Sequence, residues 1–167
     1  MEPSVLLIMG SDSDVERMRP CFEQLDGLGI VYEAHVCSAH RSPAFAAQLA
    51  GEARGRGIKL IIAAAGMAAH LAGAAAAQST LPIIGVPLDA GGLGGLDALL
   101  STVQMPPGVP VATMAIGKAG AHNAALFAAQ ILSLSDEGLA AKLEQLKAEQ
   151  ALSVASKDAE LSKQLNR

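Results

Sequence analysis

Aromatic side chains are scarce in this chain. Phe, Trp and Tyr together make up 2% of the 167 residues, and tryptophan is absent. This shortage argues against a flavin-binding electron carrier, which needs rings to sandwich its cofactor, and against stacking of nucleic-acid bases. Hydrophobic residues nevertheless make up 51% of the chain, so a core of Ala, Val, Ile and Leu is predicted. Such small side chains allow helices to pack closely on a sheet.

Clustered positive charge is also missing. The formal net charge is −4, and no stripe of Lys and Arg runs along the sequence. A nucleic-acid partner is therefore not expected. An anionic small molecule would instead be held by single arginines and by the free N–H groups at helix N-termini.

Cysteines and long apolar runs are equally limited. Cys21 and Cys37 lack the spacing of metal ligands, and without a secretion signal they indicate reduced thiols in a cytoplasmic protein. The segment 60–77 is long and nearly uncharged, but it consists mainly of Ala and Gly and contains His70. We therefore predict a buried strand, a turn and a buried helix there, and no membrane span.

Short apolar runs alternate with helix-like segments along the first 135 residues. Runs without polar residues, such as Val5–Met9, are typical of central strands in a parallel sheet. The alternation predicts an α/β fold in three layers, α/β/α, with helices on both faces of a doubly wound parallel sheet. The expected strands span 5–9, 30–37, 59–65, 82–87 and 109–116, and the expected helices include 43–54, 96–103 and 119–134.

Residues 1–135 are expected to form this single α/β domain, and residues 136–167 are expected to form a helical tail. Leu139, Leu143 and Leu146 make an apolar stripe in the tail, between charged residues. The stripe predicts a helix that covers another surface, either on its own subunit or on a neighbouring one.

Two helix starts are marked in the sequence. Ser13 and Glu16 fit a capping box with Ser13 as the N-cap, and Ser42-Pro43 combines a capping hydroxyl with proline at the first helical position. Right-handed crossovers bring the carboxyl ends of parallel strands to one edge of the sheet, where ligands bind. The loops expected at this edge are 10–14, 38–43, 66–70 and 90–95.

The loop that contains His40 and Arg41 carries the best candidate chemistry. A histidine side chain has an ordinary pKa of about 6.5 and can move a proton in either direction near neutral pH. Arg41 offers a guanidinium that can grip a phosphate or a carboxylate in two places. A loop histidine bonded to backbone and an exposed salt bridge are the plainer alternatives. The adjacent helix start favours the functional interpretation.

The loop 10–14 offers hydroxyls and a carboxylate at a strand-to-helix turn, where free N–H groups bind anions. Ser11 is free to contact a ligand, whereas Ser13 has the capping role already described. Asp14 can accept hydrogen bonds from ribose hydroxyls or can simply favour the helix dipole. His70 lies among alanines and is either a core residue or part of the site. His35 and His122 are interpreted as structural.

Other kinds of site are disfavoured. The four histidines lack the close pairing of a zinc helix, so no metal is expected. A Cys37 nucleophile with His40 as its base is conceivable, but a cysteine at a strand end is more often buried and inert. The glycine-rich segments lack both the dinucleotide-binding spacing and the lysine of a nucleotide-hydrolase phosphate loop.

Several motifs in one order resemble a known family over residues 5 to about 146. The motifs are Met9-Gly10-Ser11-Asp12-Ser13-Asp14, Ser38-Ala39-His40-Arg41-Ser42-Pro43, Ala68-Ala69-His70-Leu71, Leu81-Pro82-Ile83-Ile84-Gly85-Val86-Pro87, Val103-Gln104-Met105-Pro106, Ala115-Ile116-Gly117-Lys118-Ala119-Gly120-Ala121 and Asn123-Ala124-Ala125-Leu126. The chain resembles the class I N5-carboxyaminoimidazole ribonucleotide mutases of purine biosynthesis, the PurE family.

The resemblance implies a flavodoxin-like domain and a homo-octamer with tail helices that cross to neighbouring subunits. It implies an isomerase without metal or cofactor that converts N5-carboxyaminoimidazole ribonucleotide to 4-carboxyaminoimidazole ribonucleotide. In the family mechanism, the substrate loses CO2 in a closed pocket and the same CO2, held as a bound intermediate, adds to C4 of the ring. A histidine then removes the C4 proton.

Carried to this chain, the resemblance makes His40 the general acid/base. It assigns Ser11, Ser13 and Arg41 to the substrate phosphate and Asp14 to the ribose. The remaining predicted substrate-binding residues are Ser38, which belongs to the His40 motif, and four that would surround the carboxylate or CO2: Gly66, Ala68, His70 and Leu71.

The chain departs from the family pattern in two places. Met67 and Ala72 stand where the family usually has glycine and proline, so Met67 adds bulk beside the expected CO2 site. Asp89, Ala90 and Gly94 also differ from the residues common in the family. We expect a more flexible loop here, with a negative charge near an anionic substrate.

Two alternatives stay open. A class II relative carboxylates aminoimidazole ribonucleotide directly with CO2, but it carries lysine at the position of Arg41 and lacks the segment 68–71. A flavodoxin-like module that binds a phosphorylated small molecule without turnover is the second alternative.

Overall fold

The computed structural model describes residues 2–165. The chain divides into two compact units, Met1–Ala128 and Ala129–Arg167. The first unit holds every strand and every loop discussed above as part of a site. The expected boundary at residue 135 stays a prediction.

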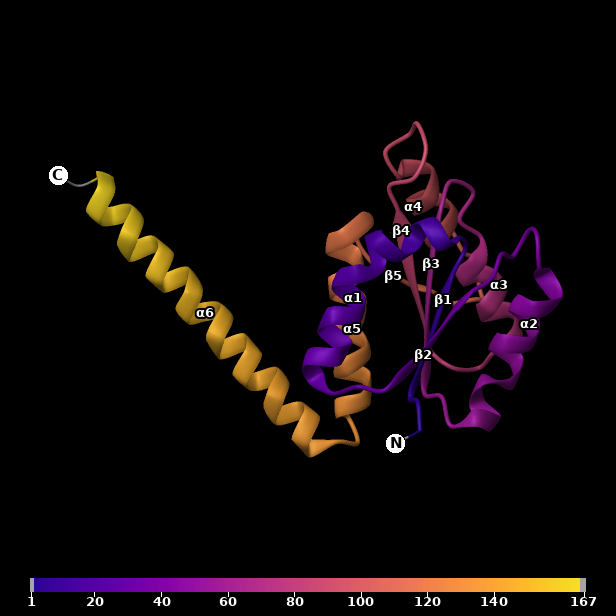
Figure 1. Cartoon of the computed structure of the whole chain (residues 1–167), viewed down its shortest axis with the longest axis horizontal. Helices are drawn as coiled ribbons and strands as arrows, with labels where there is room; N and C mark the ends of the chain where they lie inside the picture. Colours follow the sequence, from indigo (N-terminus) through magenta and orange to yellow (C-terminus); the bar gives the residue numbers. More distant parts are fainter. Residues whose placement is uncertain (1, 166–167) are drawn as a thin grey trace. The chain divides into compact units, whose positions relative to one another are not determined.

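The first unit is built on a five-stranded parallel sheet (Figure 1). Its strand order is β2-β1-β3-β4-β5, the flavodoxin-like order for a doubly wound sheet. This arrangement confirms the predicted α/β fold. The strands are β1 (Val5–Met9), β2 (Tyr32–Val36), β3 (Leu60–Gly66), β4 (Ile83–Leu88) and β5 (Ala112–Thr113).

Helices cover both faces of the sheet (Figure 1). On one face, Leu6 and Ile8 of β1 join a buried cluster with Leu49 of α2 (Pro43–Glu52) and Leu71 of α3 (Leu71–Gln78). A side chain at Gly85 of β4 would collide with Thr102 of α4 (Leu96–Val103), so this helix packs directly on the strand. The opposite face carries α1 (Val15–Leu28) and the part of α5 (Gly117–Ser133) that belongs to this unit.

The small residues of the sequence explain the tight packing. All five residues of β1 are buried, as are Ala121, Ala124, Ala125 and Ala128 of α5. Two short 3-10 turns, η1 (Asp12–Asp14) and η2 (Ala53–Arg56), complete the unit. The alanine surfaces let the helices approach the sheet without large side chains between them, as the composition predicted.

Two elements differ from the expected ones. The strand expected at 109–116 is reduced to β5, because Pro110 has no N–H for a ladder and the strand lies at the sheet edge. The uncharged segment 60–77 forms β3, a turn and most of α3, as predicted. His70 precedes the first residue of α3 as its N-cap, rather than lying inside the helix.

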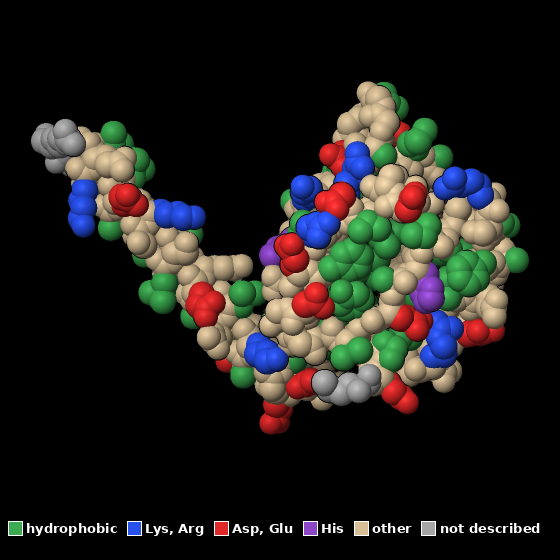
Figure 2. All heavy atoms as spheres, viewed as in Figure 1, with side chains coloured by type: hydrophobic (Ala, Val, Ile, Leu, Met, Phe, Trp, Pro, Cys, Tyr) green, Lys and Arg blue, Asp and Glu red, His purple; other side chains and the backbone are tan. Residues whose placement is uncertain are grey.

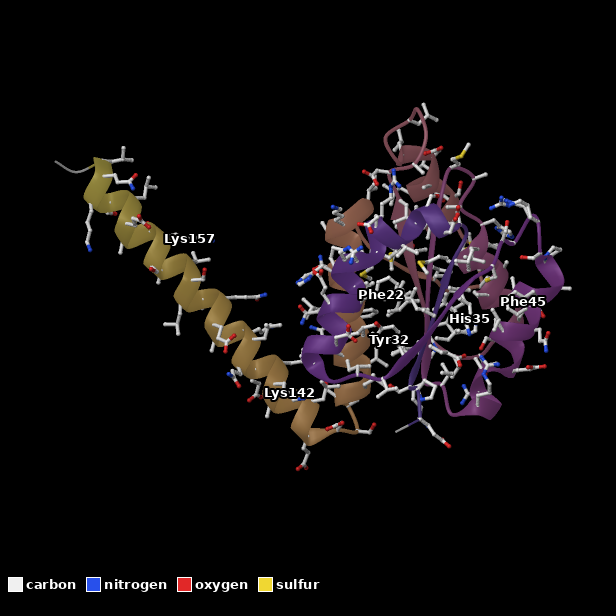
Figure 3. All side chains as sticks on the ribbon, in the orientation of Figure 1. Phe22, Tyr32, His35, Phe45, Lys142 and Lys157 are labelled. Carbon is white, nitrogen blue, oxygen red and sulfur yellow. The ribbon has the colours of Figure 1, made fainter. Side chains whose placement is uncertain are left out.

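Three of the four aromatic residues of the chain make ring contacts beside the other edge strand, β2. Tyr32 stacks on Phe22 of α1 with ring centroids 5.7 Å apart, and His35 meets Phe45 of α2 edge-on at 6.2 Å (Figure 3). Hydrophobic side chains gather on the face of the domain around β2 and α1 in Figure 2. The ring contact gives His35 a packing role, in line with its structural interpretation.

The second unit contains the end of α5 and the helix α6 (Glu137–Leu165). Leu139 is buried, whereas Leu152, Val154 and Leu161 of α6 are exposed. Among residues 2–165, no helix is long and apolar enough to cross a membrane.

Candidate active site

The loops after β1 and β2 start at the same level of the sheet, and β3 continues a short way beyond that level to Gly66. Met9, the last residue of β1, is aligned with Val36 of β2 and with Ala64 of β3. The Gly10 N–H donates to the Ala64 carbonyl at 3.1 Å, and the Cys37 N–H donates to the Met9 carbonyl at 2.8 Å. The chain order reverses on either side of β1, so this is the switch point where ligands bind in doubly wound sheets.

The loop after β1 is a capping box, but Ser11 rather than Ser13 is the N-cap. The Ser11 side chain accepts a hydrogen bond from the Ser13 N–H, and the Ser11 N–H donates to Asp14 Oδ2 at 3.0 Å. The expected cap at Ser13 is wrong because the chain enters η1 directly after Ser11, two residues earlier. Ser13 Oγ is then free to donate to Ser11 Oγ at 3.0 Å, which places both hydroxyls on one side of the turn.

Asp14 is a buried carboxylate within this polar loop. Its residue is 4% exposed, and burial raises the pKa of Asp14 above its usual range. The Ser11 N–H and the positive charge of Arg17 act in the opposite direction and lower the pKa. These two partners offset only part of the effect of burial, because the pKa of Asp14 is raised overall.

The loop after β2 is a compact turn that directs Arg41 toward the first loop. Ser42 Oγ accepts the Ser38 N–H at 2.9 Å and donates to the Ser38 carbonyl at 3.2 Å. The Ser42 hydroxyl therefore closes this turn and does not cap α2, contrary to expectation, although Pro43 does begin the helix. The Arg41 guanidinium donates to the Gly10 carbonyl at 3.1 Å. Its cation thus lies beside the Ser11 loop.

The loop after β3 brings the second histidine to the same edge. Met67 has a φ of +57°, a left-handed conformation that glycine adopts more easily. Two short backbone hydrogen-bonded turns follow, from the Ala69 N–H to the Met67 carbonyl and from the His70 N–H to the Ala68 carbonyl. They lead the chain into α3. The exposed His70 side chain is consequently available at the edge of the sheet.

One cavity of about 500 Å³ lies between these loops. It brings together all ten residues that the sequence singles out as catalytic or substrate-binding: Ser11, Ser13, Asp14, Ser38, His40, Arg41, Gly66, Ala68, His70 and Leu71. Met67 and four residues that the sequence analysis did not assign to the site also line it: Gly10, Ala39, Ala65 and Ala90. The first three of these four adjoin assigned residues, and Ala90 comes from the glycine-rich segment expected at this edge.

The cavity joins groups suited to an anionic ligand with groups suited to proton transfer. Hydroxyls, turn N–H groups and a guanidinium lie on the side formed by the loops after β1 and β2. The side formed by the loop after β3 is mainly apolar, with Ala65, Gly66 and Ala68 beside the larger Met67, Leu71 and His70. His40 and His70 also line a second cavity of about 500 Å³, so both imidazoles lie between two hollows.

Thiol and metal chemistry find little support in the described residues. Cys37 is buried, and burial raises the pKa of its thiol, which disfavours a thiolate paired with His40. Burial likewise raises the pKa of Cys21 to about 12. Within residues 2–165, no group of three His, Cys, Asp or Glu side chains is arranged to hold a metal ion.

Comparison with known proteins gives this site a context. The AIR carboxylase family profile matches residues 4–153. The chain belongs to the AIR carboxylase family. The matched residues include every loop that lines the cavity.

Individual family members match over most of their length. A Bacillus subtilis N5-carboxyaminoimidazole ribonucleotide mutase is 59% identical over 145 residues, which cover 87% of this chain and 90% of that protein. The Saccharolobus solfataricus protein of the same name is 56% identical and covers 86% and 89%. A crystal structure of Treponema denticola PurE is similar to this fold with a TM-score of 0.82, at 29% identity and 99% coverage of both chains.

Proposed function

We propose that this chain is an N5-carboxyaminoimidazole ribonucleotide mutase of purine biosynthesis. It moves a carboxyl group from the exocyclic nitrogen of its substrate to C4 of the ring and forms 4-carboxyaminoimidazole ribonucleotide. The observation that carries the proposal is the cavity in which an imidazole lies beside an anion-binding turn and a guanidinium. Relatives with 51–59% identity bear the same enzyme name.

The polar side of the cavity binds the ribose phosphate in this proposal. Ser11 and Ser13 present hydroxyls at a helix-initiating turn, and Arg41 adds a cation that is already tethered to the same loop. These groups suit a phosphate because N–H and O–H donors converge with positive charge. Asp14 accepts hydrogen bonds from the ribose hydroxyls, and Ser38 supports the turn that carries His40.

The apolar side of the cavity holds the transferred carboxyl group. The carboxylate on the exocyclic nitrogen leaves as CO2, and this nitrogen takes up a proton in its place. C4 of the electron-rich ring then attacks the same CO2 and must lose its own proton to regain aromaticity. Gly66, Ala68, His70 and Leu71 surround the neutral CO2, and the apolar members of this group limit the access of water that would compete for it.

His40 closes the proton cycle. One proton is gained at nitrogen and one is lost at C4, so a single acid/base residue returns to its initial state after each turnover. No oxidation, hydrolysis or external carboxyl donor enters this balance, and the chain needs no cofactor for it. The proposal places the enzyme in the cytoplasm, where the substrate is made.

Assembly completes the proposal. The chain forms a homo-octamer in which the tail, residues 136–167, packs on neighbouring subunits. The exposed Leu152, Val154 and Leu161 of α6 support this role, because a helix with several exposed apolar side chains gains stability from a covering surface. Light scattering coupled to size-exclusion chromatography should give eight times the chain mass; a smaller particle would contradict the assembly.

The reaction is tested with purified, metal-free protein and N5-carboxyaminoimidazole ribonucleotide, without ATP or bicarbonate. We expect rapid formation of the 4-carboxy product by the wild type and not by His40→Asn. Carboxylation of aminoimidazole ribonucleotide only when bicarbonate is supplied would assign the chain to the class II activity. Substrate binding without either reaction would support a non-catalytic binding module.

A further inference from the structure

One ion pair connects the loop after β1 with the segment after β4. Arg17 of α1 donates from Nε to Asp89 Oδ1 at 2.9 Å, and its Nη1 donates to the Ser13 carbonyl at 3.4 Å. Asp89 comes directly after β4 and immediately before the glycine-rich segment 90–95. A single guanidinium therefore bridges a cavity-lining turn and the start of this segment.

The segment 90–95 lies against the cavity. Ala90 lines it, and a Cβ added to Gly66 would be 2.5 Å from the Ala90 Cβ, so the segment rests on the end of β3. A Cβ added to Gly91 would be 3.4 Å from Met67 Cγ. Segment 90–95 therefore meets the third cavity loop at two points.

The segment has little internal support of its own. Gly91, Gly94 and Gly95 have φ values of +83°, +60° and +87°, which glycine adopts without the strain that other residues incur. Glycine also has the largest conformational freedom to lose on ordering. A contact at the start of such a segment therefore has a large influence on where the segment lies.

Asp89 is held from a second side as well. A Cβ added to Gly117, the first residue of α5, would be 3.4 Å from Asp89 Oδ1. A carboxylate at a helix N-terminus is favoured by the helix dipole. Asp89 thus lies between the Arg17 guanidinium and the start of α5. The negative charge that the sequence places at Asp89 has an opposite partner in Arg17.

We propose that Arg17 and Asp89 are positioning residues that hold segment 90–95 against the mouth of the substrate cavity. Neither residue lines the cavity, so the pair acts through Ala90 and the glycine-rich segment. The link to substrate binding rests on the proposed function. The Arg17 and Asp89 side chains are 34% and 55% exposed, and exposed ion pairs are weak. The effect on KM is therefore about two- to fivefold.

A double-mutant cycle with Arg17→Met, Asp89→Ala and the double variant tests the proposal. Both single variants should raise KM for the mutase substrate by about two- to fivefold, with kcat within about twofold. The double variant should match the single ones, because each already breaks the same contact. If the two residues acted only through their charges on an anionic substrate, Arg17→Met would raise KM and Asp89→Ala would lower it. Opposite signs would overturn the proposal.

Arg19→Met is the matched control. Arg19 lies on the same helix and pairs with exposed Glu16, but neither residue lines the cavity, and the ion pair does not involve Asp89. Its KM should equal that of the wild type. An increase as large as that of Arg17→Met would indicate a general charge effect and would count against the proposed pair.

Amide hydrogen exchange tests the positioning without any reaction. The Leu96 N–H donates to the Leu93 carbonyl at 3.2 Å. This hydrogen bond slows exchange of the Leu96 amide, and the exchange should become faster if the segment is released. Both Arg17→Met and Asp89→Ala should speed exchange over residues 90–96 and leave β1 and β3 unchanged. Unaltered exchange would refute the positioning role. Faster exchange in a protein without mutase activity would refute the proposed function and leave the positioning role intact.

Discussion

At the edge of the sheet where the strands end, the loops after β1 and β2 are organised differently from the segment after β4. The loops after β1 and β2 carry polar chemistry and hold themselves, through the Ser11–Asp14 capping box and the Ser38–Ser42 hydrogen bonds. The segment 90–95 after β4 is rich in glycine. Asp89, which directly precedes this segment, is held by the side chain of Arg17 from α1. Binding groups are thus placed by local backbone geometry, whereas the cover of the cavity depends on contacts between distant parts of the sequence.

Removing the imidazole of His40, in the loop after β2, should have the largest effect of the substitutions considered. Loss of a positioned acid/base should lower kcat by about 10²- to 10⁴-fold, measured as product formation under saturating substrate. The exposed side chain of His40 contributes little to the core, so thermal unfolding of His40→Asn should be unchanged. His35→Asn is the control. It removes the ring contact with Phe45 and should reduce stability while leaving kcat intact.

Asp14→Asn should have opposite effects on substrate binding and on stability in the loop after β1. Loss of a charged hydrogen-bond acceptor should raise KM by about 10- to 100-fold. The same substitution should increase the free energy of unfolding, although it weakens binding. Because burial raises the pKa of Asp14, the folded state disfavours its ionised form, and wild-type stability falls as the pH rises through that raised pKa.

The pH dependence provides the check on Asp14. Urea unfolding of both proteins should show that Asp14→Asn gains stability over the wild type as the pH rises above the ordinary range of an aspartate, with no difference well below it. A wild type that is more stable than the variant at neutral pH would show that the Ser11 N–H and Arg17 outweigh the burial of the carboxylate.

Gly66→Ala tests the contact between the end of β3 and segment 90–95. The new Cβ would be 2.5 Å from the Ala90 Cβ, and overpacking of this kind costs about 1–3 kcal/mol of unfolding free energy. Gly55→Ala is the matched control, since no atom lies within 4 Å of a Cβ at that position of η2. Chemical denaturation of both variants measures the difference. Equal stability would mean that Ala90 and its segment shift freely.

Met67→Gly should give the smallest effect of these substitutions, and that effect should be a gain in stability. The left-handed backbone at Met67 is strained for a residue with a side chain, and the side chain is 60% exposed, so glycine should raise the unfolding free energy by about 0.5–1 kcal/mol. Met67→Ala keeps the Cβ and should not gain. A loss of stability in Met67→Gly would show that the contact with Gly91 outweighs the strain.

Much of the fold and of the cavity could be predicted because both follow from local pattern. Buried runs such as Val5–Met9 identified the central strands, and parallel topology then required the loops with Ser11, His40 and His70 to meet. The family motifs added the proposed roles of these residues. Those roles stay predictions until substrate is bound or turned over.

The misplaced details have local physical causes. Ser11 and Ser13 both have the hydroxyl of an N-cap, and only the start of η1 decides between them. The Ser42 hydroxyl bonds to both the N–H and the carbonyl of Ser38, so it closes the preceding turn instead of capping α2. The Arg17–Asp89 pair joins residues 72 positions apart, and no spacing in the sequence indicates it.

The position of β1 between β2 and β3 has a consequence for the synthesis of the protein. This five-residue apolar strand leaves the ribosome before its neighbours β2 and β3, which end at Val36 and Gly66. Parallel neighbours cannot pair through a tight hairpin, so the edge of β1 that pairs with β3 stays open until Gly66 has been added. At about 5–20 residues per second, the nascent chain carries a hydrophobic strand with an unpaired edge for several seconds. Chaperones that shield nascent chains would act on this protein chiefly during that interval.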